Sequence, residues 1–170
     1  MVTPIQIVTA IDLAIEAHAE QTDKFGRTYL YHLSQVASMT RNDEEYVVAW
    51  LHDFVEDSQE PEEAMETIRE KFPNEIVDAV DRLTYRKGVS RNDYIERLTK
   101  NKISAKVKYY DIRSNCDIAR LKLLPNETAL KLIEKYRRDV NQLIELGALK
   151  PGQIKFLERA EYVFKGSKTS

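Results

Sequence analysis

The sequence VVAWLHDFVED, residues 47–57, joins six large apolar side chains to one histidine and three carboxylates. If the stretch is one helix, His52 and Glu56 lie one turn apart on its polar side, and so do Asp53 and Asp57. No Lys or Arg occurs within the stretch or in the five residues before it. Carboxylates this close together repel one another unless a cation lies among them. The stretch therefore predicts an inner helix with a metal site on its polar side, rather than an ordinary solvent-exposed acidic face.

The composition around this stretch indicates a globular, all-α protein. The chain has 170 residues, of which 42% are hydrophobic and 32% are charged, a mixture that excludes a disordered protein. Gly and Pro occur only five times each, which favours long helices over a turn-rich β architecture. We expect a single domain over residues 1–170, with a core over about residues 5–120 and C-terminal helices over about residues 126–164.

The spacing of apolar residues predicts a bundle of about eight to nine helices. The predicted helices cover residues 5–21, 32–39, 42–57, 61–72, 74–85, 94–100, 103–121, 125–146 and 151–164. The segment 86–93, before the sixth helix, is expected to be a basic loop. The last two helices are expected to provide packing surface or the interface of a homodimer.

Other features of the sequence favour a reducing, cytoplasmic location. Cys116 is the only cysteine, so the chain can form no internal disulfide. The N-terminal residues include Asp12 and Glu16 and lack a basic region, unlike a signal peptide. No apolar run approaches the roughly 20 residues that span a membrane, and no nucleic-acid-binding motif occurs. We therefore expect neither a membrane nor a nucleic acid as a partner.

The charged residues are distributed unevenly along the chain. Residues 41–81 contain 14 Asp or Glu and 3 Lys or Arg, whereas residues 82–108 contain 9 Lys or Arg and 2 Asp or Glu. One interpretation is a pair of solvated helix faces. The other is an acidic cluster that holds a cation beside a basic segment that binds an anion. The basic candidates are Arg86, Lys87, Arg91, Lys106 and Lys108.

A divalent metal needs more ligands than the adjacent His52 and Asp53 provide. Of the two other histidines in the chain, His32 begins a predicted helix and is a candidate ligand. Asp111 is a further candidate, because a helix would place it on one face between a lysine and an asparagine, an unusual group for a plain surface.

Three motifs, in this order, resemble those of the HD-domain metal-dependent phosphohydrolases. They are AIEAHAEQTDKFGRTYLYHLSQVA at residues 14–37, WLHDFVEDS at residues 50–58 and KVKYYDIRSN at residues 106–115. Within that family they are most similar to the (p)ppGpp hydrolase domains of RelA/SpoT homologues and to the related small stand-alone hydrolases. The resemblance covers about residues 10–120.

The resemblance implies an all-helical HD-domain fold and a metal-dependent phosphohydrolase whose substrate is a nucleotide. It implies that one metal ion, usually Mn²⁺, is bound by His32, His52, Asp53 and Asp111. It also implies that Glu56 and Asp57 handle the attacking water, and that Lys24 and Asn115 contact the nucleotide. The implied reaction releases pyrophosphate from guanosine-3′,5′-bis(diphosphate).

The chain departs from the family pattern in ways that affect recognition of the base. Asp23 stands where the family has an arginine that contacts the guanine nucleotide. Thr28 replaces a proline, and Ile112 replaces the arginine that follows the last metal ligand. The metal and water chemistry is retained. Arg27 is a candidate to take over part of the lost contact, and Lys108 is a candidate to contact phosphate.

Two other functions stay open. An HD phosphohydrolase with Asp23 at this position could act on another nucleotide, such as a dNTP, a nucleoside monophosphate or the 2′-phosphate of NADPH. A non-catalytic module could bind a metal or a nucleotide, but it would not need the adjacent acids Glu56 and Asp57. A nucleotide panel with Mn²⁺ distinguishes these functions, because the leading hypothesis requires pyrophosphate release from (p)ppGpp.

Overall fold

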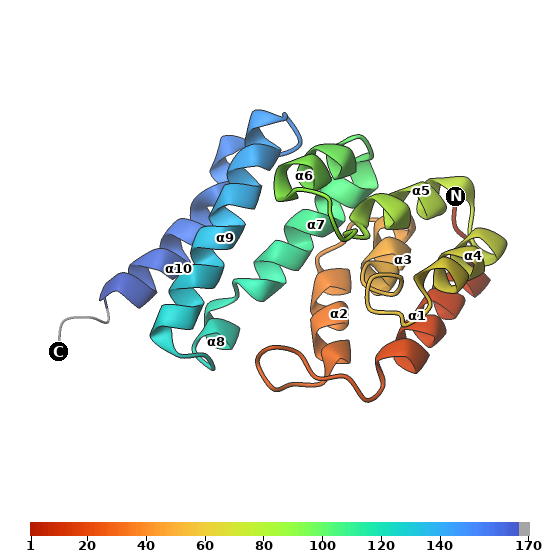
Figure 1. Cartoon of the computed structure of the whole chain (residues 1–170), viewed down its shortest axis with the longest axis horizontal. Helices are drawn as coiled ribbons and strands as arrows, with labels where there is room; N and C mark the ends of the chain where they lie inside the picture. Colours follow the sequence, from red (N-terminus) through yellow and green to blue (C-terminus); the bar gives the residue numbers. More distant parts are fainter. Residues whose placement is uncertain (167–170) are drawn as a thin grey trace.

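The computed structural model describes residues 1–166. Every regular element in that range is a helix (Figure 1). The predicted all-α fold is therefore confirmed. None of the helices in this part of the chain combines the length and hydrophobicity needed to cross a membrane. The elements in the described residues are α1 (Pro4–His18), α2 (Tyr29–Ser38), α3 (Asp43–Leu51), α4 (Pro61–Lys71), α5 (Asn74–Leu83), α6 (Arg91–Thr99), α7 (Lys102–Asn115), α8 (Ile118–Leu121), α9 (Asn126–Glu145), the 3₁₀ helix η1 (Pro151–Ile154) and α10 (Lys155–Gly166).

Helix α7 lies between two groups of helices. Figure 1 shows α1 to α5 on one side of α7, and the paired helices α9 and α10 on the other. Helix α7 contacts α2, α3 and α5 in the first group and α9 in the second. A pocket next to α7 can therefore be lined by side chains from both groups.

Helix α3 is the inner helix that its sequence predicts. Val47, Val48, Ala49 and Leu51 have no solvent-exposed surface, and the helix is packed against α1, α2, α5 and α7. Full burial of each large apolar side chain stabilises the fold by about 1.5–3 kcal/mol relative to exposure. The side chain of Asn42 caps the helix by accepting a hydrogen bond from the backbone N–H of Glu45 at 2.8 Å. Packing along the helix and the cap at its N-terminus together hold α3 in a fixed position.

The predicted extension of this helix to residue 57 is wrong. Helix α3 ends at Leu51, and the following residues form turns. The ring of His52 hydrogen-bonds through Nδ1 to the carbonyl of Ala49 at 2.7 Å, and the backbone N–H of Phe54 bonds to the carbonyl of Leu51 in a tighter turn. A side chain that donates a hydrogen bond to a nearby backbone carbonyl competes with the backbone N–H that would bond to that carbonyl in a helix. His52 and Asp53 therefore lie at the end of a rigid helix instead of within it.

The predicted long helix over residues 103–121 is divided. Helix α7 ends at Asn115, and the short helix α8 begins at Ile118. The side chain of Asp117 accepts hydrogen bonds from the backbone N–H groups of Ala119, at 2.8 Å, and Arg120, at 3.2 Å. Asp117 is thus an N-cap. The break changes the direction of the chain and turns Arg120 into the protein interior.

Three other predicted boundaries are also shifted. Helix α1 ends at His18 rather than at residue 21, and α2 begins at Tyr29 rather than at His32. Helix α6 begins at Arg91, inside the segment that was expected to be a loop, because the side chain of Ser90 caps it. Arg91 consequently belongs to the first turn of a helix.

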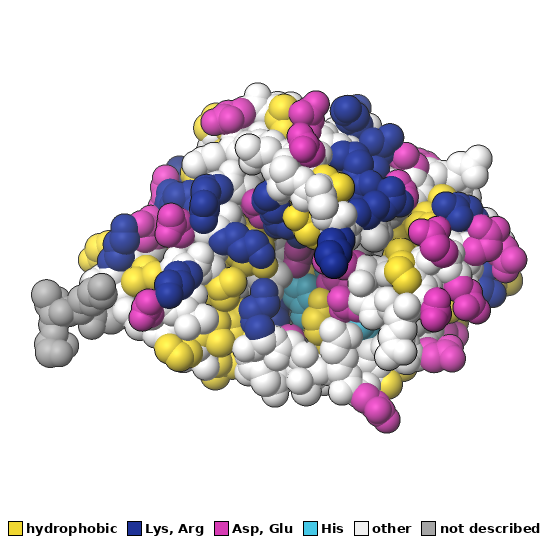
Figure 2. Space-filling view, viewed as in Figure 1, with side chains coloured by type: hydrophobic (Ala, Val, Ile, Leu, Met, Phe, Trp, Pro, Cys, Tyr) yellow, Lys and Arg dark blue, Asp and Glu magenta, His cyan; other side chains and the backbone are white. Residues whose placement is uncertain are grey.

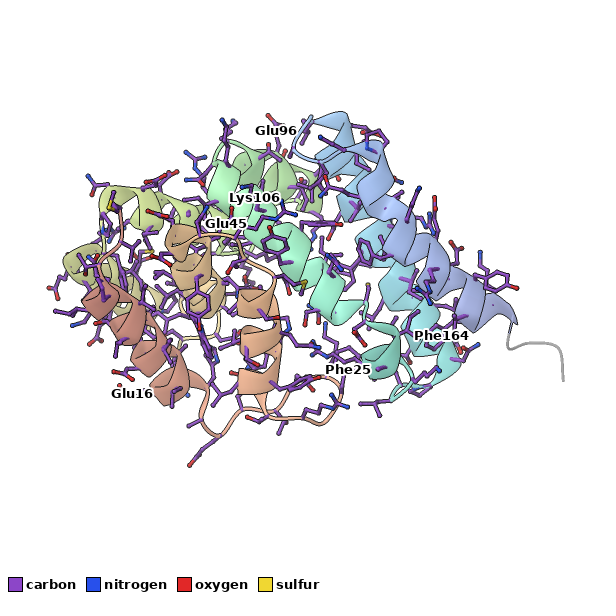
Figure 3. All side chains as sticks on the ribbon, turned by 180° about the vertical axis from the view of Figure 1, so that it is seen from behind. Glu16, Phe25, Glu45, Glu96, Lys106 and Phe164 are labelled. Carbon is purple, nitrogen blue, oxygen red and sulfur yellow. The ribbon has the colours of Figure 1, made fainter. Side chains whose placement is uncertain are left out.

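Lys106 does not belong to the anion-binding surface that the charge pattern suggested. Its Nζ lies 2.6 Å from Oε1 of Glu45, a side chain that is 1% exposed. Figure 3 shows these two labelled residues next to each other where α3 and α7 meet. Lys106 therefore neutralises a buried carboxylate and stabilises the contact between these helices.

Candidate functional site

Four side chains from three separate segments converge beside α7. His32 comes from α2, His52 and Asp53 come from the end of α3, and Asp111 comes from α7. Nε2 of His52 lies 2.9 Å from Oδ2 of Asp53 and 3.9 Å from Oδ1 of Asp111. Nε2 of His32 lies 3.2 Å from Oδ1 of Asp111 and 3.9 Å from Oδ2 of Asp53. Each imidazole thus faces one oxygen of each carboxylate, and the structure brings all four predicted metal ligands together.

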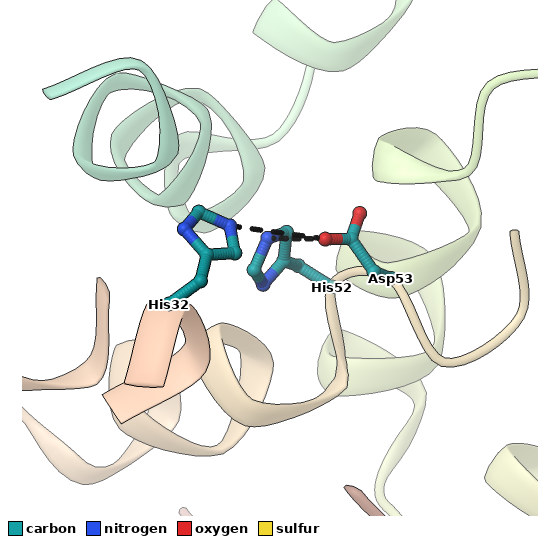
Figure 4. A group of neighbouring side chains, drawn as sticks. All are labelled: His32, His52 and Asp53. Atoms are coloured by element: carbon teal, nitrogen blue, oxygen red, sulfur yellow. Dashed lines mark ion pairs between the residues drawn. The ribbon is translucent and has the colours of Figure 1, made fainter. Parts of the chain in front are cut away.

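The donor atoms of this cluster fit a divalent cation. Ligand atoms of His32, His52 and Asp53 all lie within 4.8 Å of one another, and Figure 4 shows how these side chains face each other. Nδ1 of His52 donates to the carbonyl of Ala49, so Nε2 is the ring nitrogen left to bind a cation. That buried Nε2 has no hydrogen-bond partner in the described residues. Two imidazole nitrogens and two carboxylate oxygens suit ions such as Mn²⁺.

Neighbouring side chains hold the two carboxylates in place. The hydroxyl of Tyr29 donates to Oδ2 of Asp53 at 2.5 Å. Nζ of Lys108 donates to Oδ2 of Asp111 at 2.7 Å, and Nδ2 of Asn115 donates to Oδ1 of Asp111 at 2.6 Å. Outer partners of this kind fix the orientation of metal ligands.

The electrostatics of the cluster also favour a cation. Burial disfavours the imidazolium form of His52, but Asp53 and Asp111 outweigh burial and raise the pKa of His52 to about 9. Burial lowers the pKa of His32. Burial opposes ionisation of Asp111, yet Lys108 and the imidazoles hold the pKa of Asp111 well below its usual range. Burial also opposes ionisation of Asp53, yet His52 holds the pKa of Asp53 below its usual range. Both carboxylates are therefore ionised at neutral pH, and positive charge among them is stabilised.

Three members of the cluster, His32, Asp53 and Asp111, form the floor of a pocket with cationic walls. Figure 2 shows histidine atoms at the bottom of a hollow, with Lys and Arg side chains around it. The residues that line the pocket are Asp23, Lys24, Tyr29, His32, Asp53, Glu56, Arg91, Lys108, Asp111, Asn115, Arg120, Lys135 and Tyr136. An anionic floor beneath cationic walls suits a metal ion below a phosphorylated ligand.

Helix α9 contributes two pocket residues that the sequence did not reveal, Lys135 and Tyr136. Nζ of Lys135 lies 5.2 Å from the centroid of the Tyr136 ring, and Nζ of Lys24 lies 5.6 Å from it. Desolvation lowers the pKa of both lysines, and neighbouring cations add to this effect while Asp111 opposes it. Among residues 1–166, neither ammonium group is paired with a carboxylate. This part of the pocket therefore carries positive charge that is free to bind an anion.

Three of the four predicted substrate-binding residues line the pocket, namely Lys24, Lys108 and Asn115. The fourth, Arg27, does not line it, and its guanidinium lies 4.8 Å from the centroid of the Tyr31 ring. Arg91 from the predicted basic segment also lines the pocket, where Asp139 holds it at 2.6 Å. The roles of these residues in substrate binding stay predictions.

The two acids that were predicted to handle water occupy different places. Glu56 lines the pocket, and its Oε2 accepts a hydrogen bond from the backbone N–H of Tyr85 at 2.9 Å. Burial raises the pKa of Glu56. Asp57 accepts a hydrogen bond from Nε2 of Gln21 at 2.9 Å and lines another cavity together with His18. Both catalytic roles stay predictions, and the position of Glu56 suits the role better.

Asp23, which replaces the family's base-contacting arginine, is turned inward. It is 8% exposed. Its Oδ1 accepts hydrogen bonds from the backbone N–H groups of Phe25 and Arg27, and its Oδ2 accepts one from Nη2 of Arg120 at 2.6 Å. The carboxylate is thus fully used within the protein, and position 23 offers no cation to a bound base.

Comparison with known proteins supports the fold. No family model and no curated protein matches the sequence. Among solved structures, the chain is similar to that of a metazoan orthologue of SpoT that hydrolyses ppGpp and plays a role in starvation responses. The TM-score is 0.69 at 16% sequence identity, and the match covers 98% of this chain and 98% of that chain. The chain therefore shares the all-α fold of that ppGpp-hydrolysing protein.

Proposed function

We propose that this protein is a metal-dependent phosphohydrolase that releases pyrophosphate from guanosine-3′,5′-bis(diphosphate). The observation that carries the proposal is the convergence of two imidazoles and two aspartates, three of which line a pocket with cationic walls. The HD-domain fold and the three sequence motifs support it. In this proposal His32, His52, Asp53 and Asp111 bind the metal, for which Mn²⁺ is the leading candidate.

The proposed reaction cleaves the ester bond between the ribose 3′ oxygen and its diphosphate. A divalent ion in the cluster would polarise a phosphoryl oxygen and lower the pKa of the attacking water. Glu56 takes the proton that the water loses as its oxygen bonds to phosphorus. The ester bond breaks, the 3′ oxygen takes a proton from solvent, and Glu56 releases its proton to solvent and becomes a carboxylate again. The products are pyrophosphate and a nucleoside 5′-diphosphate with a free 3′ hydroxyl.

The cationic walls explain why a highly phosphorylated nucleotide is favoured. Arg91 is paired with Asp139, and Lys108 is paired with Asp111. The positive charge of these two side chains is therefore largely neutralised within the protein. Within residues 1–166, Lys24 and Lys135 form no ion pair with a carboxylate, so they are available to a second phosphate group. A substrate with a single phosphate would leave part of this positive charge unpaired.

Analysis of the products of (p)ppGpp hydrolysis tests the proposed reaction. The chain is stripped of metal with a chelator, loaded with Mn²⁺ and incubated with (p)ppGpp, and the products are separated by anion exchange. We expect equal amounts of pyrophosphate and the nucleoside 5′-diphosphate or 5′-triphosphate. Release of orthophosphate, or no turnover by Mn²⁺-loaded protein, would contradict the proposal.

A second candidate is an HD phosphohydrolase with another nucleotide substrate, and the inward position of Asp23 favours it. The same assay with a dNTP, a nucleoside monophosphate and NADPH distinguishes the two candidates. A higher kcat/KM for one of these than for (p)ppGpp would establish the second. A protein that binds Mn²⁺ and nucleotide without turnover would instead be a non-catalytic binding module.

Replacing Lys135 with alanine is expected to raise KM for (p)ppGpp about 10-fold, with little change in kcat. The reason is that loss of one charge-assisted contact to phosphate weakens binding by about 1.5–3 kcal/mol before solvent screening, which reduces the effect here. Steady-state kinetics at two salt concentrations measures both parameters, and the salt dependence of KM should weaken in the variant.

The matched control for this prediction is Lys131→Ala. Lys131 lies one turn earlier on α9 and pairs with Glu127, outside the pocket. We expect wild-type KM from this variant. Equal KM values for Lys135→Ala and the wild type would show that Lys135 does not contact the substrate.

A further inference from the structure

Arg120 is a charged side chain in the interior of the protein. It has no solvent-exposed surface and lies on the short helix α8. Its guanidinium lies over the ring of Phe25, 4.3 Å from the centroid, and Figure 3 labels Phe25 beside α8. A buried guanidinium needs a counter-ion and several hydrogen-bond acceptors, because isolated charge is strongly disfavoured there. The groups that satisfy Arg120 therefore indicate its role.

The counter-ion is Asp23, at the position where the family pattern has arginine. Nη2 of Arg120 donates to Oδ2 of Asp23 at 2.6 Å, and both side chains are almost fully buried. The other oxygen of Asp23 holds the backbone N–H groups of Phe25 and Arg27. The ion pair thus fixes the loop that carries Lys24 to the pocket.

The other end of the guanidinium lies against the outer side of His32. Nη1 of Arg120 donates to the backbone carbonyl of Ser114, at 3.1 Å, and to its Oγ. It also lies 3.1 Å from Oε1 of Gln35. Ser114 Oγ in turn donates to Oε1 of Gln35 at 2.9 Å. Nδ1 of His32 lies 2.9 Å from the same Oγ.

These bonds indicate which nitrogen of His32 carries the proton. The hydroxyl proton of Ser114 is used by Gln35, and a guanidinium can only donate. With its proton on Gln35, Oγ of Ser114 is an acceptor toward His32, which favours the proton of His32 on Nδ1. The lone pair of His32 is then on Nε2, the atom that faces Asp53 and Asp111. That is the tautomer a metal ligand requires.

The alternative arrangement has Arg120 donating to Nδ1 of His32. Nη1 of Arg120 also lies 3.1 Å from Nδ1 of His32. If Arg120 donated to Nδ1, the proton of His32 would be on Nε2 and would bond to Asp111. Nη1 of Arg120 carries only two protons, and the oxygen acceptors of Ser114 and Gln35 are enough to use both of them. The oxygen-bonded arrangement is therefore favoured.

We propose that Arg120 is a positioning residue that acts through Ser114 to present Nε2 of His32 to the metal, with Asp23 as its counter-ion. The inference rests on the proposed metal site, because it gives that site an outer support that the family motifs do not contain. It also assigns position 23 a new role in this chain. Asp23 supports the metal ligand and the Lys24 loop, and specificity comes from phosphate contacts rather than from a cation at position 23.

The test measures metal binding and the His32 tautomer in the whole chain without substrate. Arg120→Met keeps the length of the side chain and removes its donors and charge. Calorimetry with Mn²⁺ on metal-stripped protein is expected to show an affinity about 10- to 100-fold lower than that of the wild type. Long-range ¹H–¹⁵N spectra of the metal-free protein are expected to show Nδ1-protonated His32 in the wild type and an increased Nε2-protonated population in the variant.

Two further variants keep the result decisive. Ser114→Ala retains the Arg120–Asp23 ion pair and should show a similar loss of affinity, so it decides the matter if Arg120→Met fails to fold. Lys106→Met removes the partner of buried Glu45, and neither residue lines the pocket, so the variant should lower the melting temperature without changing Mn²⁺ affinity. Wild-type affinity in a folded Arg120→Met or Ser114→Ala protein would overturn the inference. A wild-type protein that binds no divalent metal would instead overturn the proposed function.

Discussion

Replacing Asp111 with alanine is expected to abolish both metal binding and turnover while the fold survives. The substitution removes the carboxylate whose Oδ1 lies 3.2 Å from Nε2 of His32 and 3.9 Å from Nε2 of His52. It also releases Lys108 from its 2.7 Å contact with Asp111. The freed ammonium group then lies beside the cation site and repels an ion there. We expect Mn²⁺ affinity to fall by more than about 100-fold, the upper range for loss of an outer partner alone.

Calorimetry with Mn²⁺, circular dichroism and the pyrophosphate assay together check this prediction. The matched control is Asp139→Ala, because Asp139 is also a buried aspartate paired with a cation, Arg91, and lies outside the four-residue cluster. That variant should lose stability and keep its metal. An Asp111→Ala protein that binds Mn²⁺ as tightly as the wild type would remove Asp111 from the proposed ligand set.

The fold was predictable mainly where local packing follows the apolar spacing. Burial of α3 and the all-α class follow from patterns that a single helix displays by itself. The ends of the helices depend on side-chain bonds that spacing does not show. The ring of His52 hydrogen-bonds to the carbonyl of Ala49, and Asp117 caps α8. Helices α3 and α7 therefore end earlier than the sequence predicts. Both residues are compatible with a helix interior until their hydrogen-bond partners are known.

The site was predictable only in part for a related reason. Motifs carry His52, Asp53 and Asp111 because each lies within a short characteristic segment. Lys135 comes from α9, outside the region that resembles the family, and only tertiary packing brings it to the pocket. From the sequence alone, position 23 shows only that an aspartate replaces the arginine of the family pattern. The structure shows what that position does instead, because its partner Arg120 is 97 residues away.

The position of Glu56 is the strongest reason to assign it to the attacking water. The residue lines the same pocket as Asp53, and the backbone N–H of Tyr85 holds one of its oxygens at 2.9 Å. In the described residues, its other oxygen accepts no hydrogen bond. Burial and the neighbouring acids Asp53 and Asp57 raise the pKa of Glu56, despite the opposing effects of the Tyr85 N–H and Lys108. A carboxylate with a raised pKa and a free oxygen is a suitable general base.

Replacing Glu56 with glutamine is therefore expected to lower kcat by about 10²- to 10⁴-fold while Mn²⁺ affinity stays at the wild-type value. Glutamine keeps the size of the side chain and an oxygen for the Tyr85 N–H, but it cannot accept the proton from water. In the wild type, activity should fall with decreasing pH as Glu56 becomes protonated, at a pH above the usual range for a glutamate. The comparison is Asp57→Asn, because Asp57 bonds to Gln21 outside the pocket and should retain most of the turnover. Normal turnover in Glu56→Gln, or a larger loss in Asp57→Asn, would transfer the role of general base from Glu56 to Asp57 or to another group.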